Sequence, residues 1–207
     1  MELQFHGANC ITVVGKQARL TVDDNLFELG GKSVTKPGDI VLFTSKHDQS
    51  VPGSKLSIDQ PGEYEVSGVS IQGIAARAHM DEAGTHNSTI YKIILDDLRL
   101  LVTGHTYPEL SDAQLEAIGS VDVMFVPVGG HGFTLDPIGA LKLVKKISPK
   151  VIIPTHYEQK GLKLPVVQLS LEEALKELAM EPKERVAKLK VKPAELTDNT
   201  QLIVLEA

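Results

Sequence analysis

Residues 121–130, VDVMFVPVGG, and residues 149–157, PKVIIPTHY, contain the pattern that decides the fold. Each holds a short apolar run beside turn-forming residues, which predicts a strand buried on both faces at 121–126 and at 151–153. Between them, residues 136–147 predict a helix, because Pro137 stands in the first turn and two lysines lie near the end. This alternation of strand and helix predicts sheets covered by helices, an α/β sandwich.

The pattern changes on both sides of this centre. Upstream, brief β-type runs separated by turns predict strands at 3–5, 11–14, 19–22, 40–44, 55–58, 64–66, 69–75, 88–95 and 98–103. Besides the helix at 136–147, helices are predicted at 111–118 and at 170–180. The one at 170–180 opens with a capping box from Ser170 to Glu173. Downstream, 186–191 and 201–205 predict two strands, or one strand with an arm. No repeat or linker divides the chain, so residues 1–207 are predicted to form one domain.

Composition excludes several classes of protein. The 207 residues carry a formal net charge of -6, which argues against nonspecific binding to nucleic acid. The single cysteine, Cys10, excludes an intrachain disulfide framework and is expected to be a small buried apolar residue. The apolar runs are far shorter than a bilayer requires, and the N-terminus has no targeting pattern. We therefore expect a cytoplasmic protein with no membrane partner.

Histidines gather just beyond the predicted strands. Five of the seven follow the end of a strand: His47, His79, His105, His131 and His156. Ligands of layered α/β proteins bind outside strand ends, and imidazole is the commonest metal ligand. A solitary loop histidine is usually solvated or hydrogen-bonded, so this placement alone leaves a metal site and ordinary loop histidines both open.

Several segments together carry a family resemblance. They are PGEYEV at 61–66, VSIQGI at 69–74, NSTIY at 87–91 and the two segments quoted first, with an early strand that ends in Asp23. In this order they resemble the metallo-β-lactamase fold superfamily, and most closely its short bacterial members described as zinc-dependent hydrolases. The resemblance implies a four-layer αββα sandwich of two mixed β-sheets flanked by helices. It also implies a one- or two-metal site at one edge that hydrolyses an ester, lactone, amide or phosphoester.

The metal motif of that superfamily is only partly present. The family places Thr-His-x-His-x-Asp-His after the strand at 40–43, where this chain has TSKHDQS at 44–50. His47 matches the second histidine of the motif. Ser45, Gln49 and Ser50 stand where the family has its first histidine, its aspartate and its last histidine. One of the two metal pockets has therefore lost its ligands.

The remaining ligands are assigned by the same resemblance. His79 matches the histidine after the following hairpin, with His86 as the competing alignment. His105, after Gly104, replaces the bridging aspartate of the family, and His156 matches the final histidine. The predicted metal ligands are therefore His47, His79, His105 and His156. Four imidazoles without a carboxylate favour one Zn²⁺ or similar divalent ion over a two-metal centre.

Two functions follow from this eroded motif. The first is a hydrolase-like protein that holds one metal through histidines and acts on an ester, lactone or phosphoester. The alternative is a non-catalytic pseudoenzyme that uses the same sandwich as a binding or scaffold protein. The changes at Ser45, Gln49 and Ser50 favour the alternative, whereas His105 and His156 favour the hydrolase. The sequence indicates neither the small-molecule substrate nor the oligomeric state.

Overall fold

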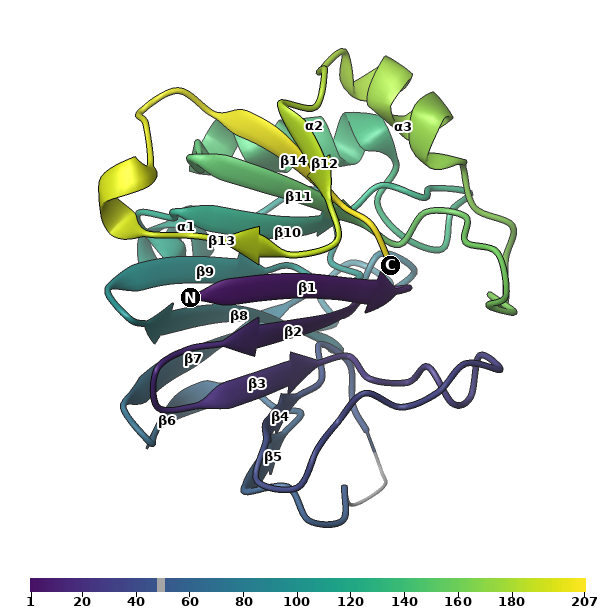
Figure 1. The fold of residues 1–207 in the computed structure, drawn as a ribbon. Coiled ribbons are helices and arrows are strands. Elements are labelled where there is room, and N and C mark those ends of the chain that lie inside the picture. The colour runs from purple at the N-terminus through teal and green to yellow at the C-terminus, as the bar shows by residue number, and fades with distance from the viewer. Residues whose placement is uncertain (48–50) are drawn as a thin grey trace.

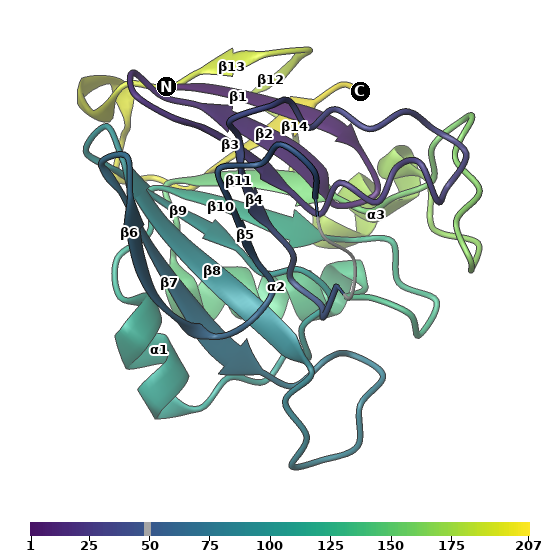
Figure 2. The same cartoon turned by 90° about the horizontal axis from the view of Figure 1, so that it is seen from below.

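The computed structural model describes residues 1–47 and 51–207 and shows two mixed β-sheets packed against each other (Figures 1 and 2). Within these residues the smaller sheet has six strands, in the order β13-β1-β2-β3-β4-β5. Their bounds are β1 Glu2–Gly7, β2 Cys10–Val14, β3 Arg19–Val22, β4 Ile40–Leu42, β5 Leu56–Ile58 and β13 Leu189–Lys190. The predicted sandwich of two mixed sheets is confirmed.

The larger sheet has eight strands in the same described residues, in the order β12-β14-β11-β10-β9-β8-β7-β6. Its strands are β6 Gly62–Val66, β7 Val69–Ala76, β8 Ser88–Leu95, β9 Leu98–Val102, β10 Val123–Pro127, β11 Val151–Thr155, β12 Glu184–Val186 and β14 Gln201–Leu205. The half from β9 to β12 is parallel, and the half from β6 to β9 is antiparallel. The hairpins predicted from the alternating segments are β6–β7 and β8–β9.

Few helices flank the sheets. They are α1 Asp112–Ile118, α2 Pro137–Ile147, α3 Leu171–Leu178 and the 3-10 turn η1 Pro193–Glu195. Helix α1 contacts β7, α2 contacts β10, and α3 packs on α2, so these helices gather on the side of the larger sheet (Figure 2). The capping box predicted at Ser170 forms, a second one closes at Ser111, and Asp136 caps α2 by accepting from the Gly139 N–H.

The core lies between the sheets. Strand β1 alternates half-buried and buried side chains, and β10 and β11 are buried throughout, as their continuous apolar sequence predicts. Cys10 is a free, fully buried cysteine, as expected. No helix in the described ranges is long and apolar enough to cross a membrane.

The tail differs from the sequence expectation. The predicted segment 186–191 is divided, because β12 pairs with β14 in the larger sheet whereas β13 pairs with β1 in the smaller one. Helix α3 ends at Leu178, two residues before the predicted end, since Ala179 adopts a left-handed conformation. The C-terminal arm therefore links both sheets.

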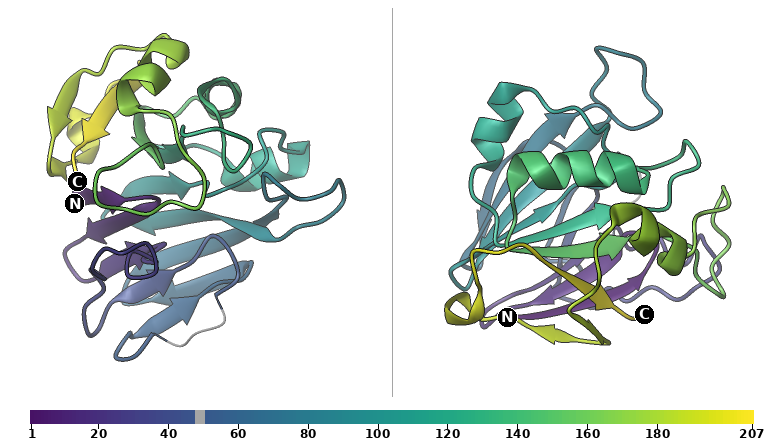
Figure 3. Two further views of the ribbon diagram at one scale, coloured as in Figure 1. Left: turned by 90° about the vertical axis from the view of Figure 1, so that its right-hand side faces the viewer. Right: turned by 90° about the horizontal axis from the view of Figure 1, so that it is seen from above.

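The strand directions place one set of loops together. Strands β3 and β4 are parallel in the smaller sheet, and β9, β10 and β11 are parallel in the larger one. The loops that follow β3 and β11 project from the same end of the sandwich, the right-hand side of Figure 1, which faces the viewer in Figure 3, left. Of the predicted ligands, His47, His105 and His156 follow β4, β9 and β11, whereas His79 follows β7.

Candidate functional site

A cavity of about 250 Å³ opens at this end, between the two sheets. Its wall comes from loops that follow β1, β3, β4, β9, β10 and β11, so segments distant in sequence converge on it. The lining residues with polar or aromatic side chains are Asn9, Asp23, Asn25, Glu28, Phe43, Thr44, Ser45, Lys46, His47, His105, Phe133 and His156.

Asp23 and Thr44 join the loops of the smaller sheet. Asp23 is only 8% exposed, and its carboxylate accepts hydrogen bonds from the Thr44 N–H and the Thr44 hydroxyl, both at 2.7 Å. Burial raises the pKa of Asp23 to about 6, although the two hydrogen bonds from Thr44 oppose this shift. Both carboxylate oxygens are therefore engaged in holding the loop after β4.

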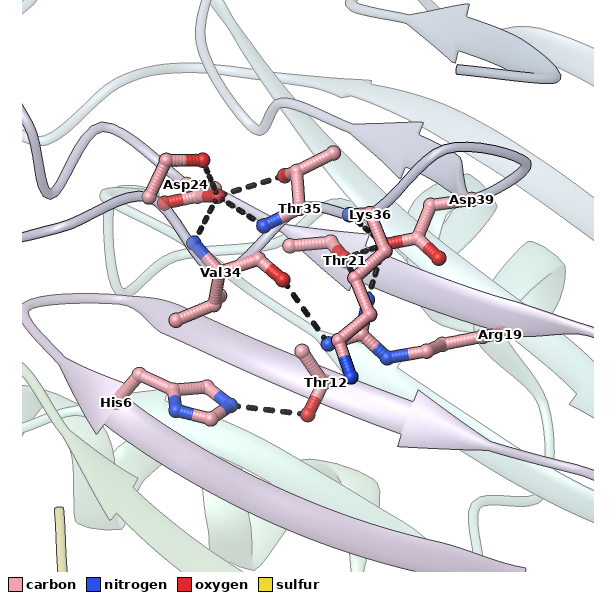
Figure 4. Close-up of polar contacts among 10 residues, drawn as sticks. His6, Thr12, Arg19, Thr21, Asp24, Val34, Thr35, Lys36 and Asp39 are labelled. Atoms are coloured by element: carbon pink, nitrogen blue, oxygen red, sulfur yellow. Dashed lines mark hydrogen bonds and ion pairs between the residues drawn. The ribbon is translucent and has the colours of Figure 1, made fainter. Parts of the chain in front are cut away.

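The loop after β3 forms another part of the wall. One oxygen of Asp24 accepts from the Ser33 hydroxyl, the Val34 N–H, and the N–H and hydroxyl of Thr35, at 2.6–2.8 Å (Figure 4). These hydrogen bonds hold the pKa of Asp24 below its usual value despite its partial burial. The loop that carries Asn25 and Glu28 is thus tied back on itself.

Backbone pairing brings His79 beside His105. The His79 N–H donates to the His105 carbonyl at 2.6 Å, and the Tyr107 N–H donates to the Arg77 carbonyl at 2.8 Å. An isolated bridge between Ala78 and Thr106 continues this antiparallel contact. These backbone hydrogen bonds hold the loop after β7 against the loop after β9. As a result His79, and not the exposed His86, is the neighbour of His105.

His105 and His156 form a pair at the cavity. Their ring centroids are 4.5 Å apart at an interplanar angle of 80°, and the Phe133 ring lies 5.0 Å from His105 and 5.7 Å from His156. Burial lowers the pKa of both imidazoles; for His105 the neighbouring histidines lower it further, to about 3. Both rings are consequently neutral near pH 7, the form that binds metals and accepts hydrogen bonds.

His156 is held in an unusual backbone conformation. Its φ is 52°, in the left-handed region that non-glycine residues seldom adopt, and its N–H donates to the Ala8 carbonyl at 2.7 Å. The residue is 3% exposed, and its ring Nδ1 lies 3.2 Å from Oε1 of Gln168. Such strain at a cavity wall is typical of functional positions.

His47 lines the cavity but is directed toward an aromatic neighbour. Its ring stacks on Phe43 with centroids 3.7 Å apart and an interplanar angle of 11°. The backbone N–H of His47 donates to an Asp59 carboxylate oxygen at 3.1 Å. The stacking uses the face of the imidazole and fixes its direction.

The four predicted ligands are thus brought into one region but do not converge on one point. His47, His105 and His156 line the cavity, and His79 adjoins His105 without lining it. Across residues 1–47 and 51–207, no three His, Cys, Asp or Glu side chains form a group that could hold a metal ion. Gln49 and Ser50, which replace the aspartate and the last histidine of the family motif, lie outside the described residues.

Sequence patterns missed several residues of this site. Asn9, Asn25 and Phe133 line the cavity, and Gln168 contacts His156 from behind. They come from loops whose approach depends on how the sheets pack, and Gln168 lies in a loop with no motif of its own. Asp23 stands out in the sequence as a strand-ending aspartate, which is a usable signal for its role.

Comparison with known proteins identifies the family. The sequence profile of the β-lactamase superfamily domain matches residues 2–156. The chain belongs to this superfamily. The matched residues include β1 to β11, among them the strands whose following loops form the cavity wall, and they end at His156.

Relatives within the superfamily are named as metal-dependent hydrolases. One from Thermoplasma acidophilum is 25% identical over 190 residues, which span 76% of this chain and 83% of that protein. One from Thermococcus onnurineus is 35% identical over 101 residues, 46% of this chain and only 44% of that protein. The second match therefore spans less than half the length of the relative.

A solved structure agrees over the whole chain. The crystal structure of a Thermotoga maritima protein, described as a candidate Zn-dependent hydrolase of the metallo-β-lactamase superfamily, has a TM-score of 0.79 and 25% identity. The match covers 100% of both chains, so the two proteins share one fold from end to end.

The residues present do not fit the metal centre that the superfamily implies. The Asp23 carboxylate, which lines the cavity, is engaged by Thr44. The donor chemistry suits a single borderline metal, because the buried Nδ1 atoms of His79 and His105 have no hydrogen-bond partner in the described structure. However, a zinc site needs three or four protein ligands that converge on one point. In the described residues the predicted histidine ligands do not form such a group.

Proposed function

We propose that this chain is a hydrolase-like protein of the β-lactamase superfamily whose cavity binds a small polar molecule without a resident metal ion. The observation that carries this proposal is the His105–His156 pair, which lines the cavity with no convergent third ligand in the described residues. Two neutral imidazoles, an aromatic wall and several amide or hydroxyl groups suit recognition of a small molecule. The single cysteine, buried and unpaired, supports a cytoplasmic location.

Metal content tests this proposal directly. The wild-type protein, purified without chelator, is compared with His156→Ala and with His86→Ala, a control at an exposed histidine away from the cavity. We expect less than about a tenth of an equivalent of metal in all three, and unchanged melting on addition of zinc, because no site is assembled. A stoichiometric metal that is lost only in His156→Ala would overturn the proposal.

A second function is favoured by a specific observation. The unpartnered Nδ1 atoms of His79 and His105, together with the names of the relatives, support a hydrolase that holds one metal through His47, His79, His105 and His156. Its substrate would be an ester, lactone or phosphoester. This candidate requires movement of His47 away from Phe43, because the stacked ring does not join the others.

A substrate panel separates the two functions. Lactone, thioester and phosphodiester compounds are tested for binding and for turnover, with His47→Ala and His105→Ala as variants. The first proposal expects saturable binding without turnover, whereas the second expects turnover that chelator and both variants abolish. Turnover that survives both replacements would show that this cavity is not the site.

A further inference from the structure

The side chain of Gln168 is oriented by the backbone around it. Its Nε2 donates to the carbonyls of Val166 at 2.9 Å and Val167 at 3.3 Å, and a carbonyl oxygen is only an acceptor. The amide nitrogen must therefore face these carbonyls, which directs Oε1 toward His156. The backbone carbonyls of Val166 and Val167 therefore fix the orientation of the Gln168 amide independently of His156.

This orientation determines which nitrogen of His156 carries the hydrogen. Oε1 can only accept, and it lies 3.2 Å from Nδ1 of His156. Nδ1 must therefore be the donor, and in a neutral imidazole the other nitrogen, Nε2, is then bare. Nε2 is the ring nitrogen that Gln168 does not contact, and His156 lines the cavity.

The surroundings hold Gln168 against His156. Gln168 is 4% exposed, and the loop next to it is fixed because the Leu169 N–H donates to the Gly129 carbonyl at 2.9 Å. A Cβ atom at Gly129 would lie 2.1 Å from the His156 carbonyl oxygen and 2.2 Å from Oε1 of Gln168. The glycine therefore provides the space in which the amide meets the imidazole.

We propose that Gln168 is a positioning residue that holds His156 in the Nδ1–H tautomer and presents its bare Nε2 to the cavity. The cavity then selects ligands that donate an O–H or N–H group to this acceptor. This selection rests on the proposed small-molecule pocket, whereas the tautomer of His156 is a property of the protein alone.

The tautomer is measured by NMR on protein labelled with ¹⁵N-histidine. We expect His156 of the wild-type protein to show a protonated Nδ1 and a bare Nε2 near pH 7. In Gln168→Met, which has a similar shape but offers only a weakly accepting sulfur, the Nε2–H tautomer should become populated. Gln159→Met, at a half-buried glutamine in the same loop, should leave it unchanged.

Either of two results overturns the positioning role: Nε2–H in the wild-type protein, or an unaltered tautomer in a folded Gln168→Met variant. The wild-type spectrum is decisive even if that variant fails to fold.

Ligand selection is tested with phenol and anisole, which differ in one hydroxyl hydrogen. We expect phenol to shift the Nε2 resonance of His156, anisole to leave it in place, and the difference to disappear in Gln168→Met. Equal shifts from both probes, or none from either, would overturn donor selection. Failure of the proposed small-molecule function is distinguished by a different measurement. If that function is wrong because the protein holds a metal, the metal content of the same preparation shows it.

Discussion

At the residue scale, Gly104 and Thr44 approach each other closely in the wall of the site. Gly104 has a φ of 56°, and a Cβ atom there would lie 2.3 Å from the hydroxyl oxygen of Thr44. Thr44 cannot move away freely, because its hydroxyl and N–H both donate to Asp23. This contact fixes the distance between the loops that carry His47 and His105.

We therefore expect Gly104→Ala to destabilise the protein more than Gly84→Ala. Gly84 has a φ of 92°, and a Cβ atom added there would have no neighbour within 4 Å, so its replacement costs only backbone strain, about 1 kcal/mol. Gly104→Ala adds overpacking of about 1–3 kcal/mol to a similar strain. Urea unfolding of both variants measures the difference, and equal losses would contradict the steric role of Thr44.

Asp23 gives a pH-dependent prediction. Its pKa is about 6 in the folded protein, above the ordinary value of 3.8, so folding favours the protonated form. Ionisation of Asp23 therefore costs stability progressively as the pH rises from about 4 to about 6, by about 3 kcal/mol in total. Below pH 4 this cost is absent, because the group is protonated in both states.

The comparison of Asp23→Asn with the wild-type protein isolates this group from other carboxylates. We expect the melting temperature of Asp23→Asn, relative to wild type, to rise between pH 4 and pH 7. A constant difference over that range would show that Asp23 does not titrate with a raised pKa.

At the scale of elements, the loop between β3 and β4 depends on Asp24. A single carboxylate oxygen accepts four hydrogen bonds from residues 33–35, and the neighbouring Arg19 contacts both Asp39 and the Val34 carbonyl (Figure 4). This network keeps a long segment without helix or strand against the smaller sheet, and it supports the wall that includes Asn25.

We expect Asp24→Asn to lower the free energy of unfolding by about 1.5–3 kcal/mol, because hydrogen bonds to a charged acceptor are replaced by weaker ones. Amide hydrogen exchange at Val34 and Thr35 should accelerate, since both N–H groups donate to this carboxylate. Asp97→Asn, in an exposed turn, serves as the control. Unaltered exchange at Val34 and Thr35 would refute the role of Asp24.

Local signals predicted most elements but not how they approach one another. The apolar runs of β10 and β11 and the caps Ser111 and Ser170 act within a few residues, so the sequence pattern contains them. The division between β12 and β13 depends on which sheet each can reach. Likewise, Gln168 meets His156 only because two loops fold together.

At the scale of the whole molecule, Asp122 joins three strands of the larger sheet. It accepts two hydrogen bonds from the Arg99 guanidinium at 2.9 Å and one from the Arg99 N–H, and it pairs with Lys150 at 3.3 Å. Arg99 lies near the start of β9, Asp122 precedes β10, and Lys150 precedes β11. These bonds align the parallel strands that lead to His105 and His156.

We expect Asp122→Ala to cost about 2 kcal/mol, a modest value for a buried carboxylate because Arg99 and Lys150 remain partly solvated. The exposed pair of Lys192 and Glu195 provides a control, since Glu195→Ala should change stability by less than about 1 kcal/mol. Chemical denaturation compares the two, and equal effects would contradict a linking role for Asp122.

The division of the C-terminal arm between the sheets has a consequence for synthesis on the ribosome. Strand β1 is made before every other strand of the two sheets, yet its outer edge pairs with β13, which follows twelve strands further along the chain. Until Leu189 and Lys190 have emerged, the backbone of β1 on that edge stays open to other extended chains. Rapid completion of the chain therefore shortens the time in which that edge can pair between copies.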